Sequence, residues 1–243
     1  MPSEAMLRDE LVKGCKILYN VGVASFAGHL STRLDDDRIL IKPRPVTWKS
    51  LTPDDLIIID YQGRRVDGPA SDGSDLMEWP IHTQVYRARP DVTWVLHAHP
   101  VQSTLMASLG IEVEPLTTET RGFAGRLPVY DDRTCLIEHN AMIVTPEYGD
   151  AMAQVMGNCR ALILKYHGVV VAGESVGEVC MTAHNLEIAA RTMLQAAAAR
   201  PLPVLSDDQR EALANARARH GARLSAVTRV EQWEKLQDYF LDG

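Results

Sequence analysis

The sequence predicts an α/β protein of one domain, in which short buried strands alternate with amphipathic helices. Of its 243 residues, 46% are hydrophobic and 23% are charged, an ordinary globular composition with enough apolar material for one large core. Apolar residues recur at helical spacing in some segments, and short unbroken apolar runs lie between these segments. No internal repeat or low-complexity linker divides the chain.

The first half of the chain contains both patterns. Leu7, Leu11 and Leu18 lie at helical spacing near the N-terminus, and the β-branched runs that follow are bounded by turn residues such as Gln62-Gly63. We expect, in order, a helix over 3–20, strands at 39–41 and 56–59, a helix over 74–87, a strand at 92–96 and a helix over 101–108.

The second half begins with a stretch, 112–133, that we expect to be irregular. Ser175 is a suitable N-cap for a long helix, and Pro201 is a suitable stop signal. We expect a helix over 148–156, strands at 161–164 and 169–173, and a helix over 176–199. From about 204 the chain is polar with helical spacing, which predicts a helical C-terminal extension of the single domain over 1–243.

Charge and hydropathy exclude several kinds of partner. The formal net charge is -7, and no cluster of basic residues offsets it, which disfavours nucleic acid and anionic membranes. No apolar run approaches the roughly 20 residues needed to span a bilayer, and the first residues do not resemble a secretory signal. The four cysteines form no C-x-x-C pair, which argues against a thiolate zinc site. We therefore expect a cytoplasmic protein with no membrane or nucleic-acid partner.

Two predicted strands end on histidines. One leads into His97-Ala98-His99, and the other leads into His167. Residues i and i+2 of a strand project to the same face, so the imidazoles of His97 and His99 can reach one ion. Imidazole is a common ligand of zinc, manganese and iron. The spacing alone leaves two interpretations open, a three-histidine metal site and a set of hydrogen-bonded core histidines.

Glu78 lies near the start of the predicted helix 74–87. One interpretation is a carboxylate beside the metal that serves as a general acid/base. The other is an exposed acid that is stabilised by the helix dipole. His82 falls four residues on, on the same helical face, where a hydrogen-bonded structural histidine is favoured over a fourth ligand.

Four segments in order resemble one known family. The runs "GHLSTR", "EWPIHTQVYRARPDVTWVLHAHP", "LILKYHGVVVAG" and "SVGEVCMTAHNLEIAARTML", within residues 5 to 198, resemble the class II aldolase/adducin family. The resemblance implies that His97, His99 and His167 bind one divalent ion per chain (Zn²⁺ or Mn²⁺) and that Glu78 is the acid/base. It implies a three-layer αβα fold with a central mixed, largely antiparallel sheet. It also implies a homotetramer with active sites at subunit interfaces.

The chain departs from the sugar-phosphate members of that family where they bind phosphate. Their motif G-N-x-S-x-R here has His29 in place of Asn, and their Thr-Gly loop here contains Arg44 between two prolines. Their two phosphate-binding serines are here Leu76 and Met77. A phosphate dianion needs polar donors, so we do not expect a phosphorylated substrate. His29 and Arg44 are candidates to bind a carboxylate, and Leu76 and Met77 are candidates to form an apolar wall against a flat ring.

These departures also rank the family's activities. The epimerase branch has Asp where Glu78 stands, and the aldolases' catalytic tyrosine aligns near Thr117 and Thr118, so epimerisation and retro-aldol cleavage of a sugar are disfavoured. A non-catalytic adducin-like scaffold would have no reason to keep all four site residues. We expect a metal-dependent carbon–carbon lyase acting on a small unphosphorylated carboxylate, with decarboxylation of a hydroxylated aromatic acid favoured. An aldolase for an unphosphorylated hydroxy-ketone or hydroxy-acid is the alternative.

Overall fold

The computed structural model describes residues 2–25, 27–69 and 76–199. Toward the C-terminus it also describes residues 206, 208, 233, 234, 236, 237, 240 and 241. The predicted extension from about 204 therefore lies mostly outside the described residues, as do positions 74 and 75 of the predicted helix 74–87. None of the described helices is long and apolar enough to cross a membrane.

An eight-stranded sheet in the order β4-β3-β2-β1-β5-β8-β7-β6 forms the middle of the molecule. Each neighbouring pair is antiparallel except β6 and β7, which are parallel. The strands are β1 (His29–Arg33), β2 (Arg38–Ile41), β3 (Ile57–Asp60), β4 (Arg65–Asp67), β5 (Trp94–Ala98), β6 (Val129–Tyr130), β7 (Ala161–Leu164) and β8 (Gly168–Gly173). The prediction of a mixed, largely antiparallel sheet is confirmed.

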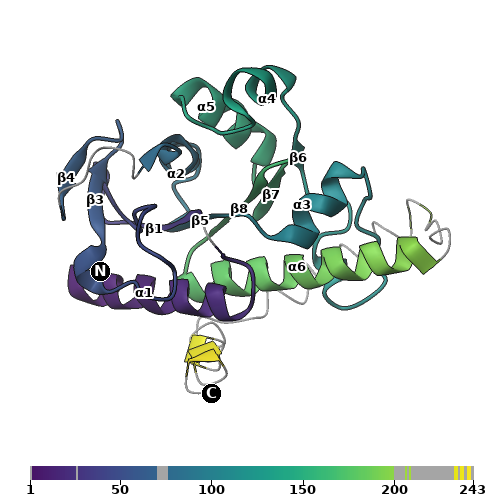
Figure 1. Ribbon diagram of the computed structural model, residues 1–243, viewed down its shortest axis with the longest axis horizontal. Helices are drawn as coiled ribbons and strands as arrows, with labels where there is room; N and C mark the ends of the chain where they lie inside the picture. Colours follow the sequence, from purple (N-terminus) through teal and green to yellow (C-terminus); the bar gives the residue numbers. More distant parts are fainter. Residues whose placement is uncertain are drawn as a thin grey trace.

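Helices cover both faces of this sheet (Figure 1). One layer contains α1 (Glu4–Asn20), α3 (Val101–Ser108) and α6 (Val176–Ala199), and the other contains α2 (Trp79–Ala88), α4 (Arg133–His139) and α5 (Pro146–Met156). Alternate residues of the strands belong to two separate core clusters, as expected for a sheet buried on both faces: Leu96 packs with the α1–α6 layer, and Val95 with the α2–α5 layer. The three-layer αβα prediction is confirmed.

Several predicted elements have the expected bounds, and others do not. The helices at 101–108 and 176–199 and the strand at 161–164 are confirmed. The predicted strand 92–96 instead runs from Trp94 to Ala98, so it includes His97. The helix predicted over 74–87 begins only at Trp79, because Glu78 is its N-cap and Pro80 occupies its first turn.

Four of the described strands and α-helices were missed: β1, β4, β6 and α4. The polar segment His29–Arg33 is the buried strand β1, because its neighbours β2 and β5 satisfy its backbone and Ser31 and Thr32 have hydrogen-bond partners of their own. The helix α4 begins at the N-cap Asp132, whose carboxylate accepts the N–H groups of Thr134 and Cys135, and it ends at Asn140 in the left-handed region. The stretch expected to be irregular also contains the short strand β6.

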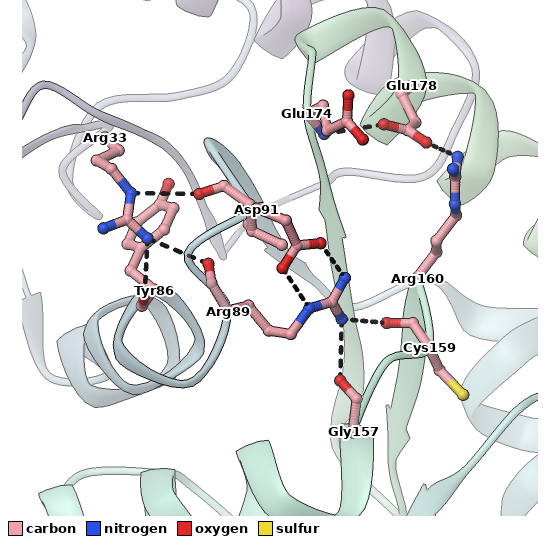
Figure 2. A network of polar contacts seen from close by, with 10 residues as sticks. Arg33, Tyr86, Arg89, Asp91, Gly157, Cys159, Arg160, Glu174 and Glu178 are labelled. Atoms are coloured by element: carbon pink, nitrogen blue, oxygen red, sulfur yellow. Dashed lines mark hydrogen bonds and ion pairs between the residues drawn. The ribbon is translucent and has the colours of Figure 1, made fainter.

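A polar network holds the sheet at the end where β5 and β7 begin (Figure 2). Arg89 forms an ion pair with Asp91 and donates to the carbonyl oxygens of Gly157 and Cys159. Beside it, Glu178 of α6 forms an ion pair with Arg160 and accepts the N–H of Glu174. These contacts join the loops that precede β5, β7 and α6, at the end of the sheet away from His97.

Candidate metal centre

The opposite end of the sheet gathers histidines from three strands. His29 opens β1 and lies opposite His97 of β5 in antiparallel register. His99 follows β5 directly, and His167 lies in the turn between β7 and β8. Because β5, β8 and β7 are consecutive and antiparallel, the end of β5 lies beside the β7–β8 turn. Gly168 permits this approach, since a Cβ at that position would overlap the His99 ring.

Three imidazole nitrogens and one carboxylate converge at this end. The Nε2 atom of His99 lies 3.0 Å from that of His97 and 3.1 Å from that of His167. The Glu78 carboxylate lies 3.3 Å from the Nε2 atom of His97 and 3.5 Å from that of His167. One donor atom from each of these four residues lies within 4.8 Å of all the others.

The hydrogen bond at the other ring nitrogen of His97 sets its tautomer. Its Nδ1 lies 3.1 Å from the carbonyl oxygen of Val169, which can only accept, so Nδ1 carries the proton and, in the neutral ring, Nε2 presents a lone pair. A metal-bound histidine is oriented in the same way, with its second nitrogen donating to a carbonyl or carboxylate. Nitrogens that share one tetrahedral zinc ion, with bonds of about 2.0–2.1 Å, lie roughly 3.3 Å apart, close to the spacing here.

Burial keeps the other histidines neutral. It lowers the pKa of His99 to about 3, with His97 and His167 adding to the shift, and it lowers the pKa of His167 to about 4. It also lowers the pKa of His29 to about 4, against the opposing hydrogen bond to the Lys42 carbonyl oxygen. Near neutral pH these rings are therefore uncharged, the state in which imidazole binds a metal.

The side chain of Glu78 faces the histidines. Although Glu78 is the N-cap residue of α2, its carboxylate forms no capping hydrogen bond to that helix. Its Oε1 accepts the backbone N–H of Ile143 at 3.2 Å. Burial opposes ionisation of this carboxyl, but the facing imidazoles of His97 and His167 outweigh burial and hold the pKa of Glu78 below its usual range. The side chain is therefore ionised near neutral pH, the protonation state that a general base requires.

His82 has the structural role favoured by the sequence. Its Nδ1 lies 2.7 Å from the hydroxyl of Ser31, which in turn lies 2.8 Å from the hydroxyl of Tyr86. The ring is fully buried and meets the His29 ring edge to face, with 5.9 Å between centroids. It is not among the four residues whose donor atoms converge.

The four predicted substrate-binding residues are placed differently from one another. His29 is buried beside His97, whereas Arg44 is exposed and its Nη1 lies 3.8 Å from the Sδ atom of Met77. Met77 is 42% exposed and directly precedes Glu78, while Leu76 is 8% exposed and packs in the core with the α2–α5 layer. The structure thus brings Arg44 and Met77 together and buries Leu76 in the core. Their roles toward a substrate remain predictions.

Sequence reasoning missed the backbone groups that hold this site. The N–H of Ile143 and the carbonyl oxygens of Val169 and Lys42 each fix one functional side chain. The sequence has no signal for Val169 or Lys42, because any residue offers a carbonyl. The position of Ile143 had a signal in the sequence. Asp132 and Asn140 are suitable residues for the two ends of the helix α4, and Ile143 follows shortly after the end of this helix.

Comparison with known proteins places the chain in a family. The family model described as Class II Aldolase and Adducin N-terminal domain matches residues 9–194. The chain is 30% identical over 202 residues to the 3,4-dihydroxyphthalate decarboxylase of Terrabacter sp. (strain DBF63), covering 79% of this chain and 82% of that protein. It is 26% identical over 207 residues to the L-fuculose phosphate aldolase of Escherichia coli (strain K12), covering 84% and 90%.

A solved structure shows the same fold. The aldolase II superfamily protein from Pseudomonas syringae superposes with a TM-score of 0.83 at 20% identity, covering 99% of this chain and 94% of that one. The cluster of Glu78 with three histidines is consistent with the divalent metal site typical of class II aldolases. With a family model matched over residues 9–194 and the fold in agreement, the chain belongs to the class II aldolase and adducin family.

Proposed function

We propose that this protein is a divalent-metal-dependent carbon–carbon lyase that decarboxylates a hydroxylated aromatic acid. The observation that carries the proposal is the ionised Glu78 carboxylate, held within 3.3 Å and 3.5 Å of two imidazoles of a three-histidine cluster. This arrangement sets a proton acceptor beside a metal-binding donor set, which is the minimum a lyase of this kind needs.

His97, His99 and His167 would hold the ion, zinc or manganese, one per chain. Their neutral nitrogens and the fixed tautomer of His97 fit such a group. When bound, the metal acts as a Lewis acid that stabilises negative charge on substrate oxygens.

Glu78 would move the proton. Its carboxylate takes the proton of a substrate hydroxyl and returns it to the ring carbon that bears the leaving carboxylate. The carbon–carbon bond then breaks, carbon dioxide departs, and the bonding electron pair returns to the ring. The phenolate product takes up one proton from water, so the overall reaction consumes one proton. The Ile143 N–H keeps the carboxylate aimed throughout.

The surroundings favour a planar carboxylate over a sugar phosphate. Arg44 is exposed and has the forked guanidinium that pairs with a carboxylate, and Met77 beside it offers an apolar surface to a ring. His29 donates Nδ1–H to the Lys42 carbonyl oxygen, so its Nε2 is left as an acceptor suited to a substrate hydroxyl. Leu76 would support this wall from the core.

The comparisons support two lyase reactions. A relative at 30% identity is named a 3,4-dihydroxyphthalate decarboxylase, a reaction on a hydroxylated aromatic dicarboxylate. Another at 26% is named an L-fuculose phosphate aldolase, and a metal-dependent aldolase for an unphosphorylated substrate is the second candidate. We favour decarboxylation because Leu76 and Met77 stand where those aldolases have hydroxyls. An adducin-like scaffold without catalysis is the third candidate.

Assembly into a homotetramer is part of the proposal. The helix α3, which begins two residues after His99, exposes Val101 and Leu105 at 68% and 45% of their surfaces, and its C-cap residue Leu109 is 61% exposed. This four-residue spacing makes one apolar stripe beside the site, which a second copy of the chain would cover. Light scattering of the purified protein tests the mass.

Product analysis separates the two lyase reactions. Purified protein supplied with Zn²⁺ or Mn²⁺ should release carbon dioxide, and no aldehyde, from at least one hydroxylated aromatic mono- or dicarboxylate in a panel. Release of an aldehyde from a hydroxy-acid or hydroxy-ketone would instead establish the aldolase. A protein that binds metal yet turns over neither group of compounds would favour the scaffold.

A further inference from the structure

We propose that Glu187 of α6 is a positioning residue for the metal ligand His99. The proposal rests on the metal centre described above and assigns a role to a buried carboxylate outside it. Glu187 is 6% exposed and lies on the face of α6 that packs against the rest of the protein. Its hydrogen bonds go to Gln102 and Ser103 and not to the metal cluster, so its effect must pass through the chain.

Glu187 holds the first turn of α3. Its Oε1 accepts the backbone N–H of Gln102 at 2.9 Å, and its Oε2 accepts the N–H of Ser103 at 2.9 Å and the Ser103 hydroxyl at 2.6 Å. All three partners donate, which matches an ionised carboxylate. The N-cap of α3 is Pro100, whose side chain forms no capping hydrogen bond. Glu187 therefore supplies from another helix the cap that α3 lacks.

This cap also fixes the backbone of His99. Only His99 and Pro100 separate the end of β5 at Ala98 from the start of α3 at Val101. The strand holds one end of this connection, and Glu187 holds the other through Gln102 and Ser103. A connection of two residues with both ends held has little freedom, so the Cα–Cβ direction of His99 follows from the position of α3.

His99 depends on this support more than His97 does. The ring of His97 is oriented by its own hydrogen bond to the Val169 carbonyl oxygen. Among the described residues, no comparable bond to the Nδ1 atom of His99 is seen, and its ring packs against Gly168, which offers no side chain. The orientation of His99 is therefore set by its backbone, which Glu187 steadies.

The test compares metal affinity among variants with a matched control on the same helix. Glu187→Ala removes all three hydrogen bonds, Glu187→Gln keeps the shape but loses one acceptor, and Ser103→Ala removes one donor. Glu178→Gln is the control, because Glu178 is a half-buried carboxylate of α6 that also accepts a backbone N–H, at the other end of the sheet (Figure 2). For each variant, Zn²⁺ affinity, the visible spectrum with Co²⁺ and the urea midpoint are measured.

We expect Zn²⁺ affinity to fall about 10- to 100-fold in Glu187→Ala, less in Glu187→Gln and least in Ser103→Ala, with a changed Co²⁺ spectrum. Glu178→Gln should lower the urea midpoint and leave affinity and spectrum unchanged. Wild-type affinity in all folded Glu187 and Ser103 variants would overturn the inference, as would an equal loss in Glu178→Gln. If Glu187→Ala does not fold, the two milder variants decide. A wild-type protein that binds no Zn²⁺ or Co²⁺ would instead refute the metal centre itself.

Discussion

The Nδ1 atom of His97 lies 3.1 Å from the carbonyl oxygen of Val169, which adjoins Val170, the register partner of His97 on β8. A backbone group of the sheet thus decides which nitrogen of His97 faces the other ligands. The bond also prevents the ring from flipping, because a flip would place a carbon against the carbonyl. The donor set is prepared by the fold before any ion arrives, which underlies the first prediction.

Purified protein should carry about one divalent ion per chain, and His97→Ala, His99→Ala and His167→Ala should each lose most of it. Three protein ligands are the usual number in a catalytic zinc site, so two do not suffice. His139→Ala, which changes a histidine of α4 outside the cluster, is the control. Metal is measured by elemental analysis after gel filtration. Full occupancy in one of the three variants would remove that residue from the site.

Glu78→Gln should keep the metal and the fold but lose activity by about two to four orders of magnitude, the usual worth of a general acid/base. The amide keeps the shape of the carboxylate but cannot take a proton. Glu138→Gln, at an exposed carboxylate of α4, should have wild-type rates. The measurement is kcat with metal content checked in parallel. A near-normal rate in Glu78→Gln would reduce Glu78 to a structural acid.

Arg44→Ala should raise KM for a hydroxylated aromatic dicarboxylate far more than for the matching monocarboxylate, with kcat little changed. A guanidinium pairs with a planar carboxylate through two charge-assisted hydrogen bonds, which the monocarboxylate lacks at this position. Arg64→Ala, at an exposed arginine paired with Asp60, is the control. Sugar phosphates should not inhibit, and micromolar competition by one of them would restore a sugar-phosphate site.

Lys42 predicts a pH effect on stability. Its Nζ is buried, donates to the Pro43 carbonyl oxygen at 2.8 Å and lies over the Trp48 ring. Burial lowers the pKa of Lys42 from 10.5 to about 8. Between these pH values the unfolded chain binds more protons than the folded one, so the free energy of unfolding rises with pH across this window.

Lys42→Met should therefore be more stable than wild type at pH 7, by up to roughly 3 kcal/mol. This advantage should shrink as pH rises from about 8 to 10.5, because the wild-type ammonium is by then neutral when folded. Urea denaturation of both proteins at matched pH values measures the difference and cancels the titration of other groups. An advantage that stays constant over this range would show that Lys42 is not titrating as described.

Ala141→Gly should raise the free energy of unfolding by about 1 kcal/mol, because Ala141 has a φ of 62°, in the left-handed region that an L side chain disfavours. Ala153→Gly, in the interior of α5, should lower it by a similar amount, since glycine is the poorer helix former there. Urea midpoints test both. A loss of stability in Ala141→Gly would mean that its methyl group packs well enough to outweigh the backbone strain.

The spacing of apolar residues predicted secondary structure correctly where the local sequence alone determines it. The helix at 101–108 and the strand at 161–164 follow directly from apolar spacing. The strand β1 does not, because Ser31 and Thr32 are polar residues whose burial depends on partners far along the chain, His82 and the Thr93 carbonyl oxygen. The local sequence around β1 contains no information about these distant hydrogen-bond partners.

The same distinction holds at the site. The i, i+2 spacing of His97 and His99 can be read from the sequence, and strand geometry then places both side chains on one face. Their proximity to His167 depends on the pairing of β5 with β8, which the sequence does not show. The spacing alone was equally consistent with a metal site and with hydrogen-bonded core histidines. The family resemblance favoured the metal site. Glu187 had one weak signal, an acid on the alanine-rich buried face of α6, whose meaning required knowing that α3 lies against it.

The arginine network of Figure 2 has a consequence for the directed evolution of this scaffold. Arg89 and Arg160 tie the loops at one end of the sheet, while Arg44 and Met77 lie in loops that belong to the other end. Mutations at Arg44 and Met77, the residues proposed to recognise the substrate, therefore leave those ties intact. A directed library confined to the less buried positions 44–46 and 77 should therefore retain a high proportion of folded members.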